Sequence, residues 1–323
     1  MATPAVSVVI PAYRSPYLHE ATASVQAQTF SDFEIIIVDD GSPEAIQIDG
    51  CLCLRQTNQG PAAARNTGIR AARGVYVAFL DSDDTWEPTY LEEQLAAIRR
   101  DPSLDLIYCN ALMMGRPESE RRRLLESAPT RAPATCASLV RGEYTVYLSG
   151  VVARREALLE AGLFDERFVH GEDFDLWVRM VKRGARMGFQ PRVLLNRRLH
   201  AESLSFDSLT HSEKALLVVE KFAARPDLTT AELAAVGWRI RSLHAEAGLE
   251  RAKRAVAKGD FEMATQALKA ANEFHRSWKL ALVRLLLRLW PRMIARVHDA
   301  REQRRLGRSH AASERPRVPS GRP

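Results

Sequence analysis

The chain has 323 residues, a hydrophobic fraction of 46% and a formal net charge of +6 at pH 7, which is the composition of an ordinary globular protein and not of a disordered or fibrous one. The positive charge is local, because residues 276–323 carry thirteen Arg and Lys against three Asp and Glu, and the remaining chain is mildly acidic. Four cysteines without paired spacing argue against a zinc site or a disulfide scaffold. No stretch approaches the roughly 20 apolar residues of a membrane-spanning helix, and no leader precedes Val6, so we expect a cytoplasmic protein.

Short apolar runs alternate with helical stretches along the first third of the chain. Strands are predicted at 6–10, 33–38, 51–54 and 75–80, and helices at 16–28 and 61–72. Runs that are apolar throughout are typical of parallel strands buried on both faces. Their alternation with helices predicts an α/β fold, with a doubly wound, mostly parallel sheet flanked by helices.

The pattern changes in the second half of the chain. Further helices are predicted at 88–99, 155–161 and 172–182, strands at 106–109 and 145–153, and an Arg-rich loop at 115–133. Beyond Phe206 only helical patterns occur, with a turn at Gly259-Asp260. We therefore predict a sheet domain over 1–206, an all-helical C-terminal region over 207–303 and a disordered basic tail over 304–323.

Acidic residues follow two of the predicted strands directly. Asp39 and Asp40 follow the second strand, and Asp81 and Asp83 follow the strand at 75–80. Ligands of open α/β sheets bind beyond the carboxyl ends of the strands, and a D-x-D spacing lets two carboxylates converge on one Mg²⁺ or Mn²⁺ ion. The alternative is that these residues form turns or caps. For Asp81 with Asp83 we favour the metal, because carboxylates that cluster without a cation repel one another.

A third acidic place is the start of the predicted helix at 172–182. Glu172 and Asp173 could simply cap this helix and complement its dipole. The functional alternative is that one of them is a general base for an acceptor hydroxyl, with a pKa raised by burial.

Five segments, taken together and in order, resemble glycosyltransferase family 2. They are Val6 to Tyr13, Ile37 to Ser42, Asn58 to Gly68, Phe79 to Asp84 and Gly171 to Trp177. Any one of these segments is weak evidence, but their common order and spacing cover residues 5–206. The resemblance implies a GT-A fold, a nucleoside-diphosphate sugar as donor, a divalent cation and inversion at the anomeric carbon.

The resemblance also assigns residues to the donor site. Four positions look like the nucleoside pocket: Pro11, Tyr13, Asp39 and Asp40. Asp81 and Asp83 match the D-x-D motif of the family, in which Asp83 would bind the metal directly, and Ser82 between them is assigned to donor binding. Asp173 matches the catalytic base.

The segment after residue 197 is similar to one that closes over the donor diphosphate in many family members. The matching positions are Arg198, His200, Ser203 and Ser205. The sequence departs from the family at Arg197, where an aromatic residue is frequent, and this puts the role of His200 in doubt. Arg65 has two open interpretations, a contact with the donor phosphates or an ion pair with a strand-end Asp.

The basic excess near the C-terminus lies partly on an amphipathic pattern. From Leu280 to Val297, apolar residues recur at helical spacing and arginines repeat every four residues along another stripe. Such a helix could lie on an anionic membrane with Trp278 and Trp290 at headgroup level, or it could pack on the preceding helices. Aromatic residues are not interleaved with the arginines for base stacking, so we expect no nucleic-acid partner.

The sequence thus predicts a metal-dependent glycosyltransferase that acts on a saccharide or lipid-linked acceptor in surface-glycan synthesis. UDP, GDP and dTDP donors would all suit the acidic pocket, and a UDP-sugar is the expected one. The competing hypothesis is a donor-binding module without turnover that acts through its basic, helical C-terminal region. No G-x-x-x-x-G-K-[ST] or G-x-G-x-x-G loop is present, which argues against a kinase-like or dinucleotide-dependent enzyme.

Overall fold

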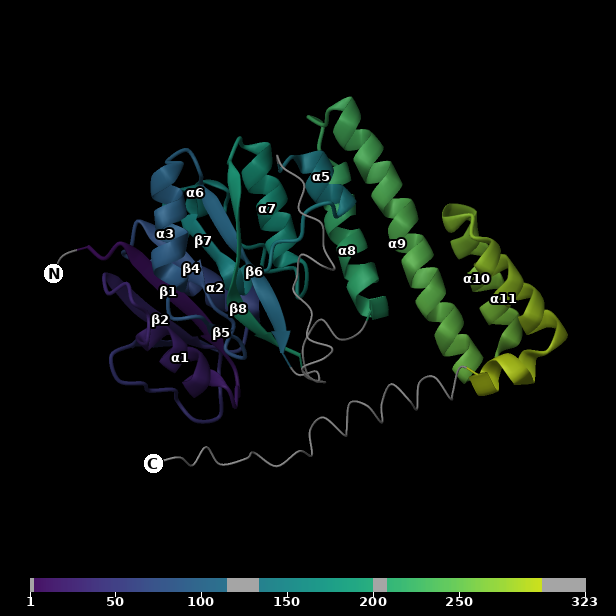
Figure 1. Cartoon of the computed structure of the whole chain (residues 1–323), viewed down its shortest axis with the longest axis horizontal. Coiled ribbons are helices and arrows are strands. Elements are labelled where there is room, and N and C mark those ends of the chain that lie inside the picture. Colours follow the sequence, from purple (N-terminus) through teal and green to yellow (C-terminus); the bar gives the residue numbers. More distant parts are fainter. Residues whose placement is uncertain (1–2, 115–133, 200–207, 298–323) are drawn as a thin grey trace. The chain divides into compact units, whose positions relative to one another are not determined.

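The computed structural model describes residues 3–114, 134–199 and 208–297 (Figure 1). Within these ranges the chain forms two compact units. The first comprises 3–114, 134–199 and 217–237, and the second comprises 208–216 and 238–297. The domain boundary predicted at 206/207, the loop predicted at 115–133 and the tail predicted at 304–323 lie outside the described residues.

The first unit is built on an eight-stranded sheet with the order β3-β2-β1-β4-β7-β6-β8-β5. The strands are β1 (Val6–Ala12), β2 (Phe33–Asp39), β3 (Leu52–Arg55), β4 (Tyr76–Phe79), β5 (Thr85–Trp86), β6 (Leu106–Met114), β7 (Val151–Arg154) and β8 (Met187–Arg198). The α/β prediction with a flanked sheet is confirmed. Strands β5 and β8, which pair with each other at the end of the sheet, were not predicted from the sequence.

The directions of the strands decide which residues meet at one edge. Strands β3, β2, β1 and β4 run parallel, whereas β7 is antiparallel to both β4 and β6. Since β8 is parallel to β6, β6 and β8 run in the same direction as β4. The carboxyl ends of β1, β2, β4 and β8 therefore share one edge of the sheet, and four of the seven strand pairings are parallel.

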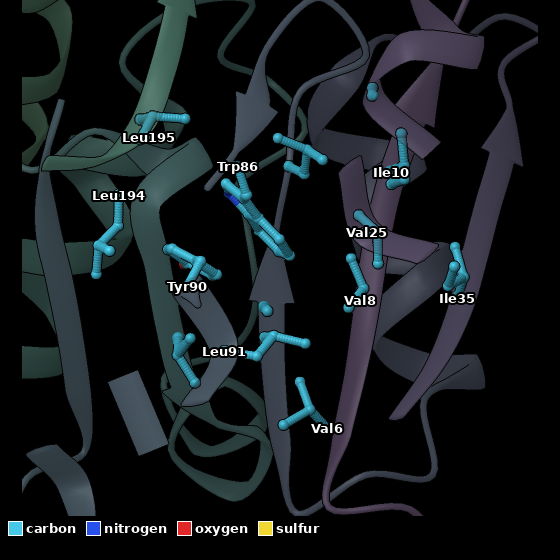
Figure 2. Packing of buried hydrophobic residues seen from close by; sticks show 14 of the residues in the cluster. Val6, Val8, Ile10, Val25, Ile35, Trp86, Tyr90, Leu91, Leu194 and Leu195 are labelled. Carbon is cyan, nitrogen blue, oxygen red and sulfur yellow. The ribbon is translucent and has the colours of Figure 1, made fainter. Parts of the chain in front are cut away.

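Alternate residues of β1 face opposite sides of the sheet, as the two-residue period of a strand requires. On one side, Val6, Val8 and Ile10 join a buried apolar layer with α1 (Leu18–Gln26) and α3 (Tyr90–Arg100). Figure 2 shows this layer, in which Trp86 stacks on Tyr90 with ring centroids 4.0 Å apart. Trp86 is therefore a core residue, because its ring is buried among apolar side chains.

The other side of the sheet is covered by α2 (Pro61–Ala71), α6 (Arg155–Glu160) and α7 (Glu172–Lys182). A Cβ atom on Gly68 of α2 would overlap Val9 Cγ1 of β1, so only glycine allows this close approach. Phe164 links the layers, because its ring packs edge-on against both Phe79 of β4 and Trp177 of α7. These contacts fix α2 and α7, the two helices that reach the carboxyl edge of the sheet.

After β8 the described chain contains helices and no further strands, as predicted. They are α8 (Ser208–Ala223), α9 (Thr230–Ala257), α10 (Phe261–His275) and α11 (Trp278–Leu289), and residues 291–297 are helical as well. The short α5 (Cys136–Arg141) precedes β7. The end of α8 and the start of α9 belong to the first unit, where Lys182 of α7 binds Glu232 of α9 at 2.8 Å.

None of the helices within the described ranges is both long and apolar enough to cross a membrane.

Two local predictions were wrong. The strand expected over Thr145 to Ala153 begins only at Val151, after a 3-10 turn over Leu148–Gly150. This turn places the Ser149 carbonyl next to β5, where it accepts a hydrogen bond from Trp86 Nε1 at 2.6 Å. The amphipathic helix expected over 280–297 breaks at Trp290, with φ −136° and ψ 61°, because Pro291 disfavours a helical residue before it.

Candidate active site

Asp39, the last residue of β2, binds its own loop. Its Oδ1 accepts a hydrogen bond from the Ser42 backbone N–H at 2.8 Å, and its Oδ2 pairs with Arg55 of β3 at 3.2 Å. Burial alone would raise the pKa of Asp39, but the hydrogen bonds from Ser42 and Ile46 and the charge of Arg55 hold this pKa below its usual value. Asp39 is therefore an ionised carboxylate that shapes the loop after β2.

Asp40 organises the loop that leads into α2. Its Oδ1 accepts hydrogen bonds from Gln56 Nε2 and the Gln59 backbone N–H, both at 2.9 Å, and its Oδ2 accepts one from the Gly60 backbone N–H at 2.8 Å. An open cavity of about 500 Å³ lies beside this loop, lined by Gly41, Arg55, Gln56, Thr57 and Asn58. Both predicted nucleoside-pocket carboxylates are thus brought to one place, next to a hollow at the carboxyl edge of the sheet.

The three carboxylates that follow β4 converge. Asp81, Asp83 and Asp84 each have a carboxylate oxygen within 4.8 Å of the others, and Asp84 is buried whereas Asp81 and Asp83 are partly exposed. The Asp84 backbone N–H donates to the Asp81 carbonyl at 3.1 Å, which closes a turn over the D-x-D motif. In the same turn the carbonyl of Ser82 accepts a hydrogen bond from Ser15 Oγ at 3.0 Å. The loop after β1 is thereby tied to the acidic turn.

The electrostatics of this cluster suit a cation. Burial, together with the charges of Asp81 and Asp83, raises the pKa of Asp84 to about 8. The ionised form of Asp84 is therefore disfavoured beside Asp81 and Asp83, and a cation bound among the three carboxylates would relieve this repulsion. Oxygen ligands at this density are the kind that Mg²⁺ and Mn²⁺ prefer, so the residues fit a divalent ion.

Arg65 of α2 joins the acidic turn to the start of α7. Its side chain is buried, and it pairs through Nη2 with Asp81 Oδ1 at 2.6 Å and through Nη1 with Glu172 Oε1 at 2.8 Å. Burial alone would lower the pKa of Arg65, but the charges of Asp81 and Glu172 hold this pKa above its usual value. Of the two sequence interpretations, the ion pair with a strand-end Asp is the one that the geometry shows.

Asp173, the predicted base, lies in the first turn of α7. The helix starts after Gly171, whose φ of 78° favours glycine. The Asp173 Oδ1 accepts a hydrogen bond from the Phe174 backbone N–H at 2.7 Å. Burial, reinforced by the negative charge of Asp81, raises the pKa of Asp173, and burial likewise raises the pKa of Glu172 to about 7 against the opposing effect of Arg65. A carboxyl group with a raised pKa is suited to accept a proton near neutral pH.

The end of β8 adds cations to the same edge. The Arg198 backbone N–H donates to Asp84 Oδ1 at 2.9 Å, and its Nε donates to the Asp83 carbonyl at 3.1 Å. The guanidinium of Arg198 lies 4.1 Å from the centroid of the Tyr17 ring. Arg197, where the family pattern has an aromatic residue, instead lies 4.4 Å from the ring centroid of Tyr147.

The remaining predicted residues divide into three groups. Pro11 is buried within β1, next to the edge. Tyr13 follows β1 with 45% of its surface exposed, beside Arg14. His200, together with Ser203 and Ser205, lies outside the described residues.

Comparison with known families matches residues 7–131 to the model described as glycosyl transferase family 2, and residues 76–206 to that described as glycosyl transferase family group 2. Together these matches span residues 7–206, which include every carboxylate of the candidate site. The chain belongs to glycosyltransferase family 2. It is thus a glycosyltransferase, and the resemblance noted in its five sequence segments is confirmed.

Relatives that are named as glycosyltransferases match this chain. This chain is 29% identical over 227 residues to an uncharacterised glycosyltransferase of Rickettsia prowazekii, and the match covers 66% of this chain and 69% of the relative. It is 31% identical over 196 residues to the amylovoran biosynthesis glycosyltransferase AmsB of Erwinia amylovora, covering 55% of this chain and 64% of AmsB.

Solved structures show the same fold. TarS of S. aureus, residues 1–349 in complex with UDP-GlcNAc, superposes with a TM-score of 0.58 at 18% identity and covers 91% of this chain and 88% of that one. The mannosyltransferase PcManGT from Pyrobaculum calidifontis, in complex with GDP-Man and Mn²⁺, gives a TM-score of 0.61 at 18% identity and covers 97% and 86%. The GT-A fold with a helical appendage is thereby confirmed for this glycosyltransferase.

Sequence reasoning missed three participants of the site. Ser149 accepts a hydrogen bond from the Asp81 backbone N–H at 3.1 Å, Tyr147 lies under Arg197, and Tyr17 lies under Arg198. Nothing in the local pattern of these residues marks them, because each meets its partner only through the pairing of distant strands. The position of Asp84 next to the D-x-D motif could have indicated a place in the site. However, an Asp at this position is equally well explained as a turn residue.

Proposed function

We propose that this glycosyltransferase moves a sugar from a nucleoside-diphosphate sugar to an acceptor hydroxyl with inversion at the anomeric carbon, and that it requires a divalent cation. The observation that carries the proposal is the chain Asp81–Arg65–Glu172. It joins the acidic turn, where a cation fits, to the helix start that bears Asp173. A cation site and a carboxyl group with a raised pKa are the two elements that such a transfer needs.

The donor would lie along the carboxyl edge of the sheet. Asp39, Asp40 and the neighbouring Tyr13 would bind the nucleoside beside the cavity near Gly41. Asp81 and Asp83 would hold Mn²⁺ or Mg²⁺, which would neutralise the diphosphate. TarS and PcManGT, which share the fold, were solved with a UDP-sugar and with a GDP-sugar plus Mn²⁺. We take a UDP-sugar as the expected donor.

Asp173 would act as general base. In the transfer, the acceptor oxygen forms a bond to the anomeric carbon as the bond from that carbon to the diphosphate oxygen breaks, and the hydroxyl proton passes to Asp173. The hydrogen bond from Phe174 fixes one carboxylate oxygen, which orients the group before the acceptor arrives. Arg198, anchored on the acidic turn, would add positive charge where the diphosphate departs.

The acceptor class is inferred from a relative. AmsB is named for the biosynthesis of amylovoran, and we propose a role in polysaccharide or lipid-linked glycan synthesis for this chain as well. The cytoplasmic location expected from the sequence stays a prediction.

Calorimetric titration of UDP, GDP and dTDP, with and without Mn²⁺, tests the donor site. We expect one nucleotide to bind in a Mn²⁺-dependent manner and Asp83→Ala to abolish that dependence. Arg100→Ala, at the exposed end of α3, is a matched control that should bind like the wild type. Equal nucleotide affinity of Asp83→Ala and the wild type would refute the metal assignment. Metal-dependent binding without turnover on any saccharide acceptor would instead favour the donor-binding module.

A further inference from the structure

Helix α11 is apolar on two opposite sides, and the second unit covers only one of them. Leu287 of α11 is buried in a cluster with residues of α9 and α10, and Leu280 and Ile294 pack against the same cluster. Leu280 and Leu287 are seven residues apart and therefore lie along one line of α11, whereas Ile294 reaches the same cluster from beyond the break at Trp290. On this side, α11 packs on the preceding helices, which is one of the two alternatives considered from the sequence.

The opposite side of α11 has no cover among the described residues of the second unit. Trp278, Leu282, Leu285 and Leu289 recur at intervals of four, three and four residues and thus lie on one face, which we call the outer face of α11. Their surfaces are 71%, 43%, 51% and 56% exposed. Trp290, Met293 and Val297 continue the exposure beyond the helix, at 55%, 47% and 46%. A contiguous exposed apolar surface of this kind marks an interaction site rather than an ordinary scatter of apolar residues.

The charges beside this face have one sign. Residues 278–297 contain five basic and no acidic residues, and Lys279, Arg288, Arg292 and Arg296 are exposed. Arg288 and Lys279 lie on either flank of the outer face when α11 is projected along its axis, since each residue turns the helix by about 100°. The apolar face is therefore bordered by cations on both flanks.

We propose that the outer face of α11 docks on an anionic lipid surface. Leucines on such a face enter the acyl boundary, tryptophans prefer the headgroup level, and long basic side chains reach the lipid phosphates while their stems stay on apolar surface. The absence of any acidic residue from 278–297 favours an anionic lipid over a folded protein partner, whose surface would carry both signs. Docking here would bring the transferase to acceptors held at a membrane.

Vesicle co-sedimentation of the full chain tests this proposal without donor, metal or acceptor. It therefore fails or succeeds independently of the proposed reaction. We expect binding to vesicles of phosphatidylcholine mixed with phosphatidylglycerol, weak binding to phosphatidylcholine alone, and a loss of binding as salt is raised. Lipids brominated on the acyl chain should quench the fluorescence of Trp278.

Two variants separate the apolar and the charged contributions. Leu285→Ser with Leu289→Ser should weaken binding to mixed vesicles at least about ten-fold, and Arg288→Glu with Arg292→Glu should weaken it at least about 25-fold, since each cation contributes about five-fold. Met263→Ser and Lys269→Glu change residues of α10 that are also exposed and should bind like the wild type. Circular dichroism verifies that each variant is folded.

Three outcomes would overturn the proposal. One is a wild-type chain that does not sediment with the mixed vesicles. The second is binding that the Leu and Arg variants leave unchanged. The third is a concentration-dependent dimer, seen by light scattering and abolished by the Leu variant, without vesicle binding; a second copy of the chain would then cover the outer face.

Discussion

Replacing Arg65 with Met should destabilise the sheet unit, because the substitution leaves the carboxylate of Glu172 buried without its cation. The side chains of this pair are only 6% and 10% exposed, so solvent screens the interaction little. Removal of one partner of a buried pair costs roughly 3–5 kcal/mol. Met keeps the packing of the Arg65 stem, so we expect the free energy of unfolding of Arg65→Met to fall by about this amount.

A double-mutant cycle with Glu172→Gln isolates the electrostatic part. Alone, Glu172→Gln keeps a hydrogen-bond acceptor for Arg65 and should cost about 1–2 kcal/mol. In the double variant no buried carboxylate remains at position 172, so the combined loss should be smaller than the sum of the two by about 1–3 kcal/mol. Additivity within about 0.5 kcal/mol would refute the view that Arg65 neutralises Glu172.

Urea unfolding followed by tryptophan fluorescence measures these differences. Trp86 and Trp177 are buried in the same unit as Arg65, whereas Trp278 and Trp290 are exposed in the folded chain and should report little. Arg73→Met is the matched control. Arg73 pairs with Glu34 at 2.6 Å, but its side chain is 52% exposed, and exposed pairs contribute roughly 0–1 kcal/mol.

The effect of Arg65→Met should also depend on pH. In the folded wild type burial raises the pKa of Glu172 to about 7, above the 4.5 of the unfolded chain. The folded state therefore holds this proton more tightly, and the contribution of Glu172 to stability falls as the pH rises through that window. Without Arg65 the folded pKa is higher still and the fall continues further. The stability gap between wild type and variant should be wider at about pH 8 than at about pH 6.

Three further predictions concern the turn after β4, the base and the sheet. In chelator at about pH 8, Asp84→Asn should raise the thermal midpoint by a few degrees, because burial and its acidic neighbours raise the pKa of Asp84 to about 8; a lower midpoint in differential scanning calorimetry would contradict the repulsion. Asp173→Asn should lower kcat by about 10²-fold to 10⁴-fold with nucleotide affinity kept; unchanged turnover would exclude Asp173 as the base. Gly68→Ala should destabilise the chain by about 1–3 kcal/mol, because the added Cβ would overlap Val9 Cγ1. Val9→Ala in the same chain should relieve part of this loss. Equal unfolding curves for Gly68→Ala and the wild type would disprove the close approach.

The residues at the carboxyl edge could be predicted from the sequence because their position follows from local patterns. The apolar runs that form β2 and β4 end at Asp39 and just before Asp81, and parallel strands present their carboxyl ends at one edge. Neither step requires knowledge of distant contacts. The D-x-D turn, the two carboxylates after β2 and the carboxylates at the start of α7 were therefore located correctly in the fold, while their roles in binding and catalysis remain proposals.

Only the tertiary structure decided how these pieces contact one another. Arg65 was equally compatible with two partners in the sequence, and its ion pair with Glu172 joins residues 107 positions apart. Strand β8 mixes basic and apolar residues without a two-residue period, so its place in the sheet comes from pairing with β6.

The C-terminal helices show the same division. The sequence alone determined that residues 280–297 are amphipathic and basic, because a helical period needs no information beyond the chain itself. Which apolar line is buried, through Leu280 and Leu287, and which remains exposed, through Leu282 and Leu285, depends on where α9 and α10 pack. Local spacing sets the faces of a helix, whereas burial of one face requires a partner that only the folded chain supplies.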